Sequence, residues 1–282
     1  MSAALNLDAA AAQLCQQCGF EFRGLLGRGA FKSAYLAVYN GAPFALKLAA
    51  VSGGTDRLVR EAEALRDCEH PSLAKLFQAF AHSHAGHQLW VVYEEYLGGG
   101  TLEAGLKQWP ITPDSVRYVG IGLAEALEHL HDKRLVHRDI KPANIMFRGG
   151  SDKRPVLTDF GIVRMLDQPT LTHAFMQMGP GTPAYAAPEQ LNNEKSLIDW
   201  RTDQFDLGLV LAECLLGHHP WAASGKSIHD AILTVASRQE LPAASAQRLH
   251  DLGFASLTQA LKVWPVARYR RPTDFIDALK RN

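Results

Sequence analysis

Residues 136–146, V-H-R-D-I-K-P-A-N-I-M, constrain this chain more than any other stretch. Asp139, Lys141 and Asn144 can converge on one point if the residues between them form a loop that ends in a short strand. A carboxylate, an ammonium and a carboxamide together suit a reaction that needs a base, a phosphate clamp and a metal ligand. Phosphoryl transfer has those needs. The question for the rest of the chain is whether it supplies a nucleotide pocket and a second metal ligand.

Composition narrows the class of protein. The 282 residues can bury a sizeable core in one large domain or two lobes, and 47% hydrophobic with 21% charged residues is ordinary for a soluble globular protein. Positive and negative side chains balance at 29 each, so no basic field indicates nucleic acid or an anionic membrane. No apolar run suits a membrane helix, the N-terminus does not resemble a signal peptide, and the four cysteines form no disulfide framework. We therefore expect a reduced, cytoplasmic protein without a nucleic-acid partner or a membrane span.

Two glycines and one lysine characterise the segment at 20–50. It alternates like three strands, with Gly27 and Gly29 in the first turn and Asn40-Gly41, a strong hairpin signal, in the second. Glycines let backbone N–H groups approach phosphates closely, although hairpin turns use glycine anyway. Lys47 lies in the apolar third strand, where an ammonium is costly unless an anionic group meets it. Together these residues favour a phosphate-binding site.

Three further segments complete this region. Residues 55–68 have helical spacing and carry Glu61, which is either the anionic partner of Lys47 or part of a solvated helix face. Residues 73–82 and 88–93 are typical of two more strands. Residues 94–101 include three consecutive glycines and mark a hinge between lobes. We expect backbone groups of this hinge to bond a flat heterocycle such as adenine.

Two groups of side chains that could bind a metal ion are better explained without one. Residues 1–17 are typical of a short helix or a loose arm, and Cys15 with Cys18 at its end could be half of a zinc site. No second pair of ligands completes that site, so ordinary packing is favoured. His82, His84 and His87 fall in a short polar loop between two strands, where solvent-facing side chains are favoured over ligands.

The C-terminal part of the chain supplies a second metal ligand. Residues 113–133 predict a largely buried helix that leads into 136–146, and a short strand at 155–158 precedes Asp159. Mg²⁺ prefers hard oxygen ligands and binds substrate phosphates, so Asn144 and Asp159 form one candidate metal set at two neighbouring strand ends. Residues 162–185 have little periodicity, and loops of this length are usually functional or disordered. The remainder is typical of helices, with Trp221, Trp264 and Phe275 expected in the core.

Seven motifs stand in one order along the chain. They are Gly27-x-Gly29, Phe44-Ala45-Leu46-Lys47, Glu61, His137-Arg138-Asp139-Ile140-Lys141-Pro142-Ala143-Asn144, Asp159-Phe160-Gly161, Ala187-Pro188-Glu189 and Asp203-x-x-Asp206-Leu207-Gly208. In these motifs and their order, the chain resembles the eukaryotic-like (Hanks-type) protein kinases from about residue 18 to 281. Residues 181–190 and Pro265-x-x-Arg268-Tyr269 are similar to the bacterial Ser/Thr branch.

The resemblance implies an α+β, two-lobed protein kinase-like fold. A small antiparallel β-sheet N-lobe with one main helix would span about 18–97, and a larger, mostly helical C-lobe would span about 98–282. Residues 1–17 would form an N-terminal arm that precedes the kinase domain at 18–282.

The resemblance also implies an ATP-dependent Ser/Thr protein kinase that uses ATP and Mg²⁺, with Mn²⁺ as an alternative, and acts on protein substrates. Asp139 would accept or orient the proton of the substrate hydroxyl, and Lys141 would steady the γ-phosphate. Lys47, paired with Glu61, would hold the α and β phosphates. The other implied nucleotide contacts are Gly27, Gly29, Ala34, Ala45, Glu95, Leu97, Leu102 and Met146, with Asn144 and Asp159 binding Mg²⁺.

Further implied roles are structural. Glu189 would pair with Arg268 as a tie within the second lobe, and Asp203 would anchor the backbone of the catalytic loop. An apolar column that aligns the lobes would consist of Leu65, Leu76, His137 and Phe160.

The chain departs from the family pattern around the nucleotide. Lys32 replaces the third glycine of the nucleotide loop, and Ala34 replaces the valine that follows it. Thr101 replaces a frequent acidic ribose contact. The position that guards the back of the nucleotide pocket falls on Glu94, where a carboxylate is unusual.

Regulation and two alternatives remain open. Arg138 precedes Asp139, and in the family such an arginine usually accompanies activation by loop phosphorylation. Thr170 and Thr172 are the expected sites of autophosphorylation between self-associating copies; an unmodified polar loop is the other interpretation. A pseudokinase or nucleotide-binding scaffold is favoured only by the altered nucleotide loop. A small-molecule phosphotransferase of related fold is disfavoured by the long loop that ends at Glu189.

Overall fold

The computed structural model describes residues 5–29, 32–51, 55–108, 111–149, 152–159, 183–222 and 227–281, with the backbone alone at 56, 57, 60 and 61. The described chain divides into two compact units. The first comprises the chain up to Glu69 together with Ala74–Leu97. The second comprises His70–Leu73 and the described residues from Gly98 onward. The first unit thus ends where the glycine-rich residues 98–100 begin.

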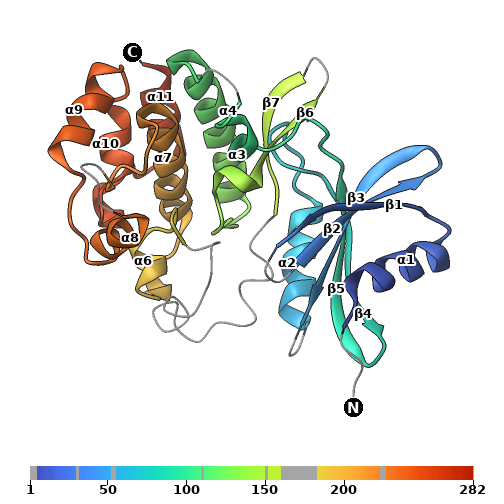
Figure 1. The fold of residues 1–282 in the computed structure, drawn as a ribbon. Helices are drawn as coiled ribbons and strands as arrows, with labels where there is room; N and C mark the ends of the chain where they lie inside the picture. The colour runs from blue at the N-terminus through green and yellow to red at the C-terminus, as the bar shows by residue number, and fades with distance from the viewer. Residues whose placement is uncertain are drawn as a thin grey trace. The chain divides into compact units, whose positions relative to one another are not determined.

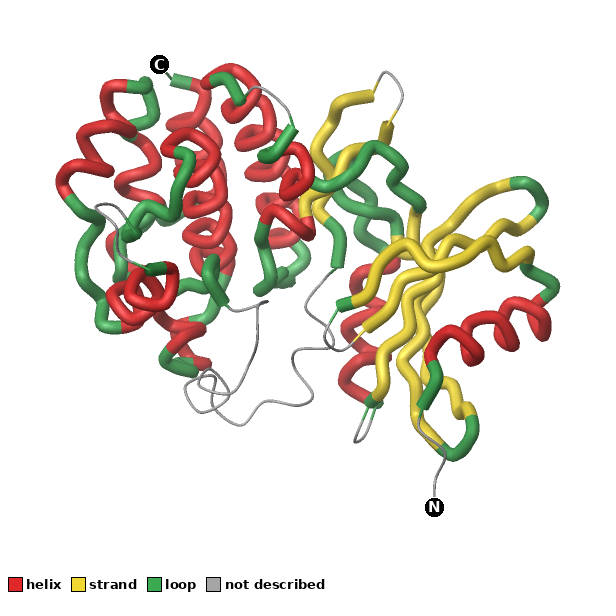
Figure 2. Tube along the Cα trace, in the orientation of Figure 1, coloured by secondary structure: helices red, strands yellow, loops and turns green. Residues whose placement is uncertain are grey.

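An antiparallel sheet of five strands forms the first unit, in the order β1-β2-β3-β5-β4 (Figures 1 and 2). The predicted hairpin at Asn40-Gly41 is confirmed, because both residues have left-handed φ values, of 50° and 79°, between β2 and β3. Ala85 and Gly86 repeat this geometry between β4 and β5. The strands are β1 (Glu21–Arg28), β2 (Lys32–Tyr39), β3 (Ala42–Ala50), β4 (Leu76–His84) and β5 (His87–Glu95).

The register between β3 and β5 separates two kinds of side chain. Lys47 lies opposite Val92, and Ala45 lies opposite Glu94. Because side chains alternate across a strand, these four residues share one face of the sheet. Leu46, between Ala45 and Lys47, points to the other face, where the apolar core of this unit lies.

Helix α1 (Leu7–Cys18) packs on that apolar face. It begins at the Asn6 side chain, which accepts hydrogen bonds from the amides of Asp8 and Ala9 at 3.0 and 3.1 Å, and it ends at Gly19 with a left-handed φ of 69°. Figure 1 shows α1 lying along the sheet. The segment is therefore a short, well-capped helix and not a loose arm. Its apolar side joins one buried cluster with the sheet, through Ala10, Ala11, Leu14, Cys15, Tyr35, Ala37, Phe44, Leu46, Leu48, Leu89, Val91 and Tyr93.

Helix α2 (Asp56–Arg66) confirms the helix predicted at 55–68. Its buried positions, Leu58, Ala62 and Leu65, are those that the helical spacing predicts, and the helix packs against β4. The first unit is thus a small antiparallel sheet that packs with α1 and α2.

Three helices form the centre of the second unit: α4 (Pro113–Asp132), α7 (Trp200–Leu216) and α11 (Pro272–Lys280) pack together (Figure 1). A capping box between Thr112 and Ser115 and a proline at the first helical position fix the start of α4. The other elements are α3 (Leu102–Gly105), η1 (Pro142–Asn144), β6 (Ile145–Gly149), β7 (Asp152–Leu157), α6 (Pro188–Leu191), η3 (Lys195–Leu197), α8 (Ile228–Ala236), α9 (Ala243–Asp251), α10 (Ser256–Ala260) and η5 (Pro265–Ala267).

The three aromatic residues that were expected in the core of this unit differ in burial. Trp221 and Phe275 are buried as predicted. The prediction is wrong for Trp264, which is half exposed because it stands just before η5, and the guanidinium of Arg238 lies over its ring at 3.7 Å from the centroid. Among the described helices, none is both long and apolar enough to cross a membrane.

Candidate active site

A buried carboxylate fixes the loop that carries the predicted catalytic residues. Asp203, on α7, accepts hydrogen bonds from the backbone amides of His137 and Arg138, both at 2.7 Å. Burial raises the pKa of Asp203 to about 7, and the two amide donors act in the opposite direction. Its predicted role as the anchor of the loop backbone is confirmed.

Arg138 adopts a left-handed φ of 66°, which is uncommon for a residue other than glycine. Its amide is held by Asp203, and its carbonyl accepts a hydrogen bond from Nε2 of Gln190 at 2.9 Å. The other end of the Gln190 amide, Oε1, accepts from the backbone amide of Ala187 at 2.9 Å. Gln190 therefore ties the catalytic loop to the start of α6. This role was not predicted, because the glutamine and the loop are far apart along the chain.

Asp139, Lys141 and Asn144 converge as their spacing predicts. Lys141 Nζ donates to both carboxylate oxygens of Asp139, at 3.1 and 2.9 Å. Asn144 Nδ2 donates to the backbone carbonyl of Asp139 at 2.7 Å and to its Oδ2 at 2.9 Å. The 3₁₀ turn η1 brings Asn144 back toward Asp139. The carboxylate is thus oriented by an ammonium and an amide, with 10% of its side chain exposed.

The second predicted metal ligand stands at the neighbouring strand end. Strands β6 and β7 pair antiparallel, with Ile145 opposite Leu157. Asn144 immediately precedes β6, and the amide of Thr158, just after β7, donates to the Asn144 carbonyl at 3.0 Å. Asp159 follows with a φ of 64°. The hairpin therefore places Asn144 and Asp159 at the same end of two paired strands.

This donor set suits Mg²⁺. Asn144 uses its amide nitrogen to bind Asp139, so its oxygen Oδ1 is the atom turned away from that carboxylate. Asp159 adds carboxylate oxygens at the adjoining strand end, and Mg²⁺ prefers such hard ligands while keeping waters and substrate phosphates in its shell. No group of three or more His, Cys, Asp or Glu within the described ranges could hold a metal ion by itself. Two protein ligands fit an ion that shares its shell with a nucleotide.

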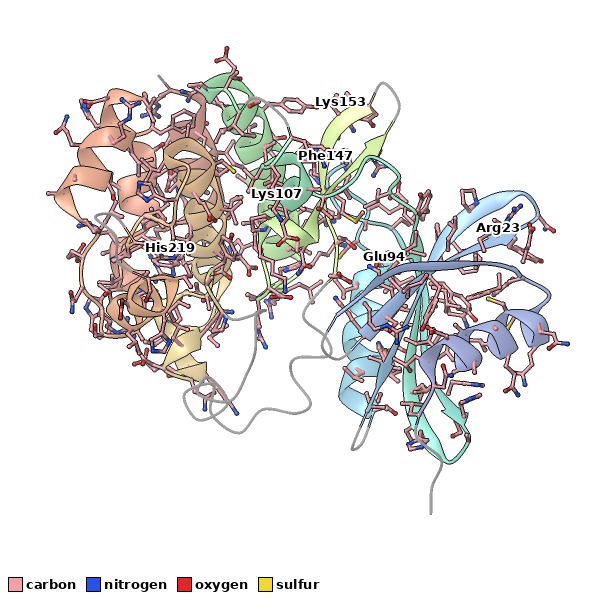
Figure 3. All side chains as sticks on the ribbon, viewed as in Figure 1. Arg23, Glu94, Lys107, Phe147, Lys153 and His219 are labelled. Atoms are coloured by element: carbon pink, nitrogen blue, oxygen red, sulfur yellow. The ribbon has the colours of Figure 1, made fainter. Side chains whose placement is uncertain are left out.

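In the first unit, Lys47 forms an ion pair with Glu94 (Figure 3 labels Glu94). Both side chains are largely buried, with 14% of Lys47 and 7% of Glu94 exposed. The family pattern predicts Glu61 as the partner of Lys47. The backbone of Glu61 lies in α2, and its side chain lies outside the described residues. Glu94 is an unusual carboxylate for its position in the sequence, but its binding to Lys47 was not predicted.

Gly27 and Gly29 lie at the end of β1 and just beyond it. Neither has a positive φ, and a Cβ built on Gly27 would meet no atom within 4 Å. The amide of Gly29 donates to the Lys32 carbonyl at 2.8 Å, and Arg28 between the glycines binds both carboxylate oxygens of Asp8 at 2.8 Å. Open space above an ordinary backbone conformation is consistent with close approach of a ligand to Gly27.

Glycines 98 and 99 have a structural function that was not predicted. The amide of Gly98 donates to Arg148 O at 3.2 Å, and that of Gly99 donates to Phe147 O at 2.9 Å. A Cβ on Gly99 would lie 2.6 Å from Phe147 O and 2.7 Å from Gly149 N, closer than any Cβ can approach. The expectation that the hinge backbone is free to bond adenine is therefore wrong for these two amides, which bind β6.

The other predicted nucleotide contacts are distributed over both units, and their roles stay predictions. Glu95, at the end of β5, is half-buried, and its amide donates to Lys75 O at 2.9 Å. Thr101 forms a bridge to Met146, and its hydroxyl caps α3 by accepting from Ala104 N at 3.1 Å. Capping explains a threonine at this position. Of the remaining positions, Ala45, Leu97 and Leu102 are buried and Ala34 and Met146 are half-buried.

Several predicted residues cannot be placed. Phe160, Thr170 and Thr172 lie outside the described residues. Of the predicted apolar column, Leu65 and Leu76 are buried in the first unit, and His137 is buried in the second, where its Nε2 lies 3.1 Å from Thr158 O.

The predicted tie between Glu189 and Arg268 is confirmed. Arg268 Nη1 and Nη2 bind the two carboxylate oxygens of Glu189 at 2.6 and 2.9 Å, and neither side chain has any exposed surface. Thr202 Oγ1 also donates to Glu189 Oε1 at 2.9 Å. The guanidinium lies over the Phe205 ring, 4.7 Å from its centroid. This pair joins the start of α6 to the segment that follows η5.

His219 is a buried residue for which no role was predicted from the sequence. Its Nε2 lies 3.0 Å from the carbonyl oxygen of Ala184, and its Nδ1 accepts from the amide of Trp221 at 3.3 Å. The ring is thus neutral, with its proton on Nε2, and burial lowers its pKa to about 4. His219 (labelled in Figure 3) holds the segment that leads into α6.

Comparison with known proteins agrees with this geometry. Residues 20–269 match the family model for the protein kinase domain. Serine/threonine-protein kinase PknJ of Mycobacterium tuberculosis is 31% identical over 273 residues, which are 92% of this chain and 44% of that protein. Serine/threonine-protein kinase PknF of the same species is 31% identical over 274 residues, 93% of this chain and 56% of that protein. The chain therefore spans about half the length of these curated relatives.

A solved structure shows the same fold. The crystal structure of Rad53 1-466 in complex with AMP-PNP matches 96% of this chain and 69% of its own with a TM-score of 0.70, at 22% sequence identity. The predicted two-lobed, kinase-like fold is thus confirmed. The family match covers most of the sequence, and we conclude that this chain belongs to the Hanks-type protein kinase family.

Proposed function

We propose that this protein is an ATP-dependent Ser/Thr protein kinase that transfers the γ-phosphate of ATP to Ser and Thr hydroxyls of protein substrates in the cytoplasm. One observation carries the proposal. The carboxylate of Asp139 is oriented by Lys141 and Asn144 on a loop that Asp203 anchors, which is the arrangement that phosphoryl transfer needs around its base. The names of the curated relatives support the Ser/Thr class.

Each charged residue has one task in this reaction. Asp139 orients the substrate hydroxyl and accepts its proton. Lys141, which binds both oxygens of Asp139, steadies the γ-phosphate. Lys47 binds the α and β phosphates. Positioned charges supply most of the catalysis in such a site, so the loss of one should lower the rate by orders of magnitude.

Mg²⁺, or Mn²⁺ in its place, would be held by Asn144 and Asp159 and would neutralise charge on the phosphates. The proposed contacts of the nucleotide itself are Gly27, Gly29, Ala34, Ala45, Glu61, Glu95, Leu97, Leu102 and Met146. We assign the kinase domain to 18–282, with its lobes at about 18–97 and 98–282, preceded by an N-terminal arm at 1–17 that supplies most of α1 and packs on the sheet of the first unit.

Autophosphorylation at Thr170 and Thr172, between associating copies, is part of the proposal. Arg138 supports it, because its Nε atom is buried and has no hydrogen-bond partner among the residues that the structure describes. A phosphate can pair with such a guanidinium. Mass spectrometry after incubation with ATP and Mg²⁺ tests this directly. Labelling of a generic substrate while both threonines stay unmodified would contradict it.

Transfer of label from ATP to a basic protein tests the kinase activity. Wild type should label the substrate, and Asp139→Asn should reduce the rate by orders of magnitude while ATP still binds. Asp132→Asn is the matched control, because it makes the same chemical change at an exposed position, the last residue of α4. If wild type and Asp139→Asn label equally poorly while both bind ATP, the protein is a nucleotide-binding scaffold.

A further inference from the structure

The ion pair between Lys47 and Glu94 lies on the face of the sheet opposite to the one that α1 covers. Lys47 stands opposite Val92, whereas Glu94 stands opposite Ala45, so the two charged residues are diagonal neighbours on facing strands. The ammonium must therefore turn along the strand toward the level of Ala45 to reach the carboxylate. Strand register, and not a mobile loop, holds the two groups together.

Burial makes this contact energetically important. Most of both side chains is withdrawn from water, and their cross-strand partners, Val92 opposite Lys47 and Ala45 opposite Glu94, are apolar. Removing one partner of such a pair leaves the other charge uncompensated in a medium of low polarity. The chain thus supplies its own anion to Lys47, and no ligand is needed to satisfy the ammonium.

A phosphate that binds Lys47 meets this anion. A carboxylate and a phosphate both attract the ammonium, and they repel each other more strongly here than in water because the effective dielectric constant is lower. The repulsion grows with the number of charges on the nucleotide. An uncharged nucleoside does not experience it.

We propose that Glu94 determines nucleotide affinity: its carboxylate holds Lys47 in the nucleotide-free protein and competes with the phosphates of ATP for the ammonium. The inference rests on the proposed function, because that function assigns ATP to Lys47. It makes Glu94 a positioning residue for Lys47, and it gives the unusual carboxylate a role in discriminating nucleotides by their phosphate number.

Calorimetric titration of adenosine, ADP and ATP in the presence of Mg²⁺ tests the competition. Glu94→Gln keeps the shape of the side chain and removes its charge, so ATP should bind about tenfold more tightly, ADP by a smaller factor, and adenosine within about twofold of wild type. Glu63→Gln, at an exposed position of α2 in the same unit, is the matched control and should change none of the three affinities. An equal shift for all three ligands, or unchanged ATP affinity, would overturn the proposal.

Thermal unfolding without nucleotide gives a second readout. Because Lys47 and Glu94 are paired, the loss of melting temperature in the double variant Lys47→Met/Glu94→Gln should be smaller than the sum of the losses in the two single variants. Additive losses overturn the pairing.

These results are separable from the kinase assay. Charge-dependent affinity without Asp139-dependent transfer refutes the kinase and leaves Glu94 its role, whereas transfer with unaltered affinities refutes the role of Glu94 alone.

Discussion

Replacing Glu189 with glutamine should strongly destabilise the second unit, because it removes one partner of a fully buried ion pair. The Arg268 guanidinium would keep its three contacts with backbone carbonyls, to Lys262 O at 2.7 Å, Arg201 O at 2.9 Å and Val263 O at 3.4 Å. It would thus stay fixed where it is, with no exposed surface and without its counter-charge. Glutamine preserves the shape of the side chain, so packing contributes little to the expected effect.

The magnitude follows from this burial. Breaking a buried ion pair by removing one partner costs about 3–5 kcal/mol, because the remaining charge cannot reach water. For a domain of this size 1 kcal/mol corresponds to roughly 2–4 °C, so the melting temperature should fall by about 6–20 °C. The double variant Glu189→Leu/Arg268→Met removes both charges and should lose less stability than Glu189→Gln alone.

Urea and thermal unfolding, followed by circular dichroism, measure these differences. Glu125→Gln is the matched control, since Glu125 pairs with Lys280 at 3.2 Å on the surface, where both side chains are about half exposed. It should shift the midpoint only slightly. Two results would refute the argument that an uncompensated buried charge dominates the loss of stability. One is a decrease below about 1 kcal/mol in the free energy of unfolding for Glu189→Gln. The other is a loss for Glu189→Leu/Arg268→Met as large as the sum of the losses in Glu189→Leu and Arg268→Met.

Two further predictions concern stability. Burial lowers the pKa of His219 to about 4, whereas a histidine in the unfolded chain has its ordinary pKa near 6.5. Between these two pH values the folded state therefore binds fewer protons than the unfolded state. The free energy of unfolding should fall by up to about 3 kcal/mol as the pH decreases from 6.5 to 4. Urea midpoints across this range should show a flatter dependence for His219→Gln but not for the exposed His250→Gln. Gly99→Ala should lower the melting temperature by several degrees, because its Cβ would lie 2.6 Å from the Phe147 carbonyl oxygen. Gly27→Ala is the control and should not lower the melting temperature, because a Cβ at Gly27 meets open space. Equal losses in the two variants would contradict this explanation.

Sequence spacing predicted the convergence of Asp139, Lys141 and Asn144, because these residues are close along the chain and a single turn joins them. The tie between Glu189 and Arg268 could be predicted only through the family resemblance. The two residues are 79 positions apart, and nothing in the local pattern of either indicates its partner.

The Lys47–Glu94 pair was not predicted, for a physical reason. It depends on β5 lying beside β3, with β4 on the outside, and on a register that sets Ala45 opposite Glu94. Neither strand order nor register follows from alternation within one strand. Gly99 presents a similar case, since its need for a bare Cα arises from β6, a strand that lies far along the chain.

Helix α1 has a practical consequence for anyone who shortens this chain. The residues that match the protein kinase model begin at 20, so a chain trimmed to that match would lack α1 entirely. Leu14 and Cys15 would no longer cover the sheet, which would expose a contiguous apolar surface of the kind that promotes aggregation. Arg28, between the two glycines, would lose its hold on Asp8. Poor solubility of such a fragment would therefore indicate a missing helix, and would say nothing about whether the longer chain can fold.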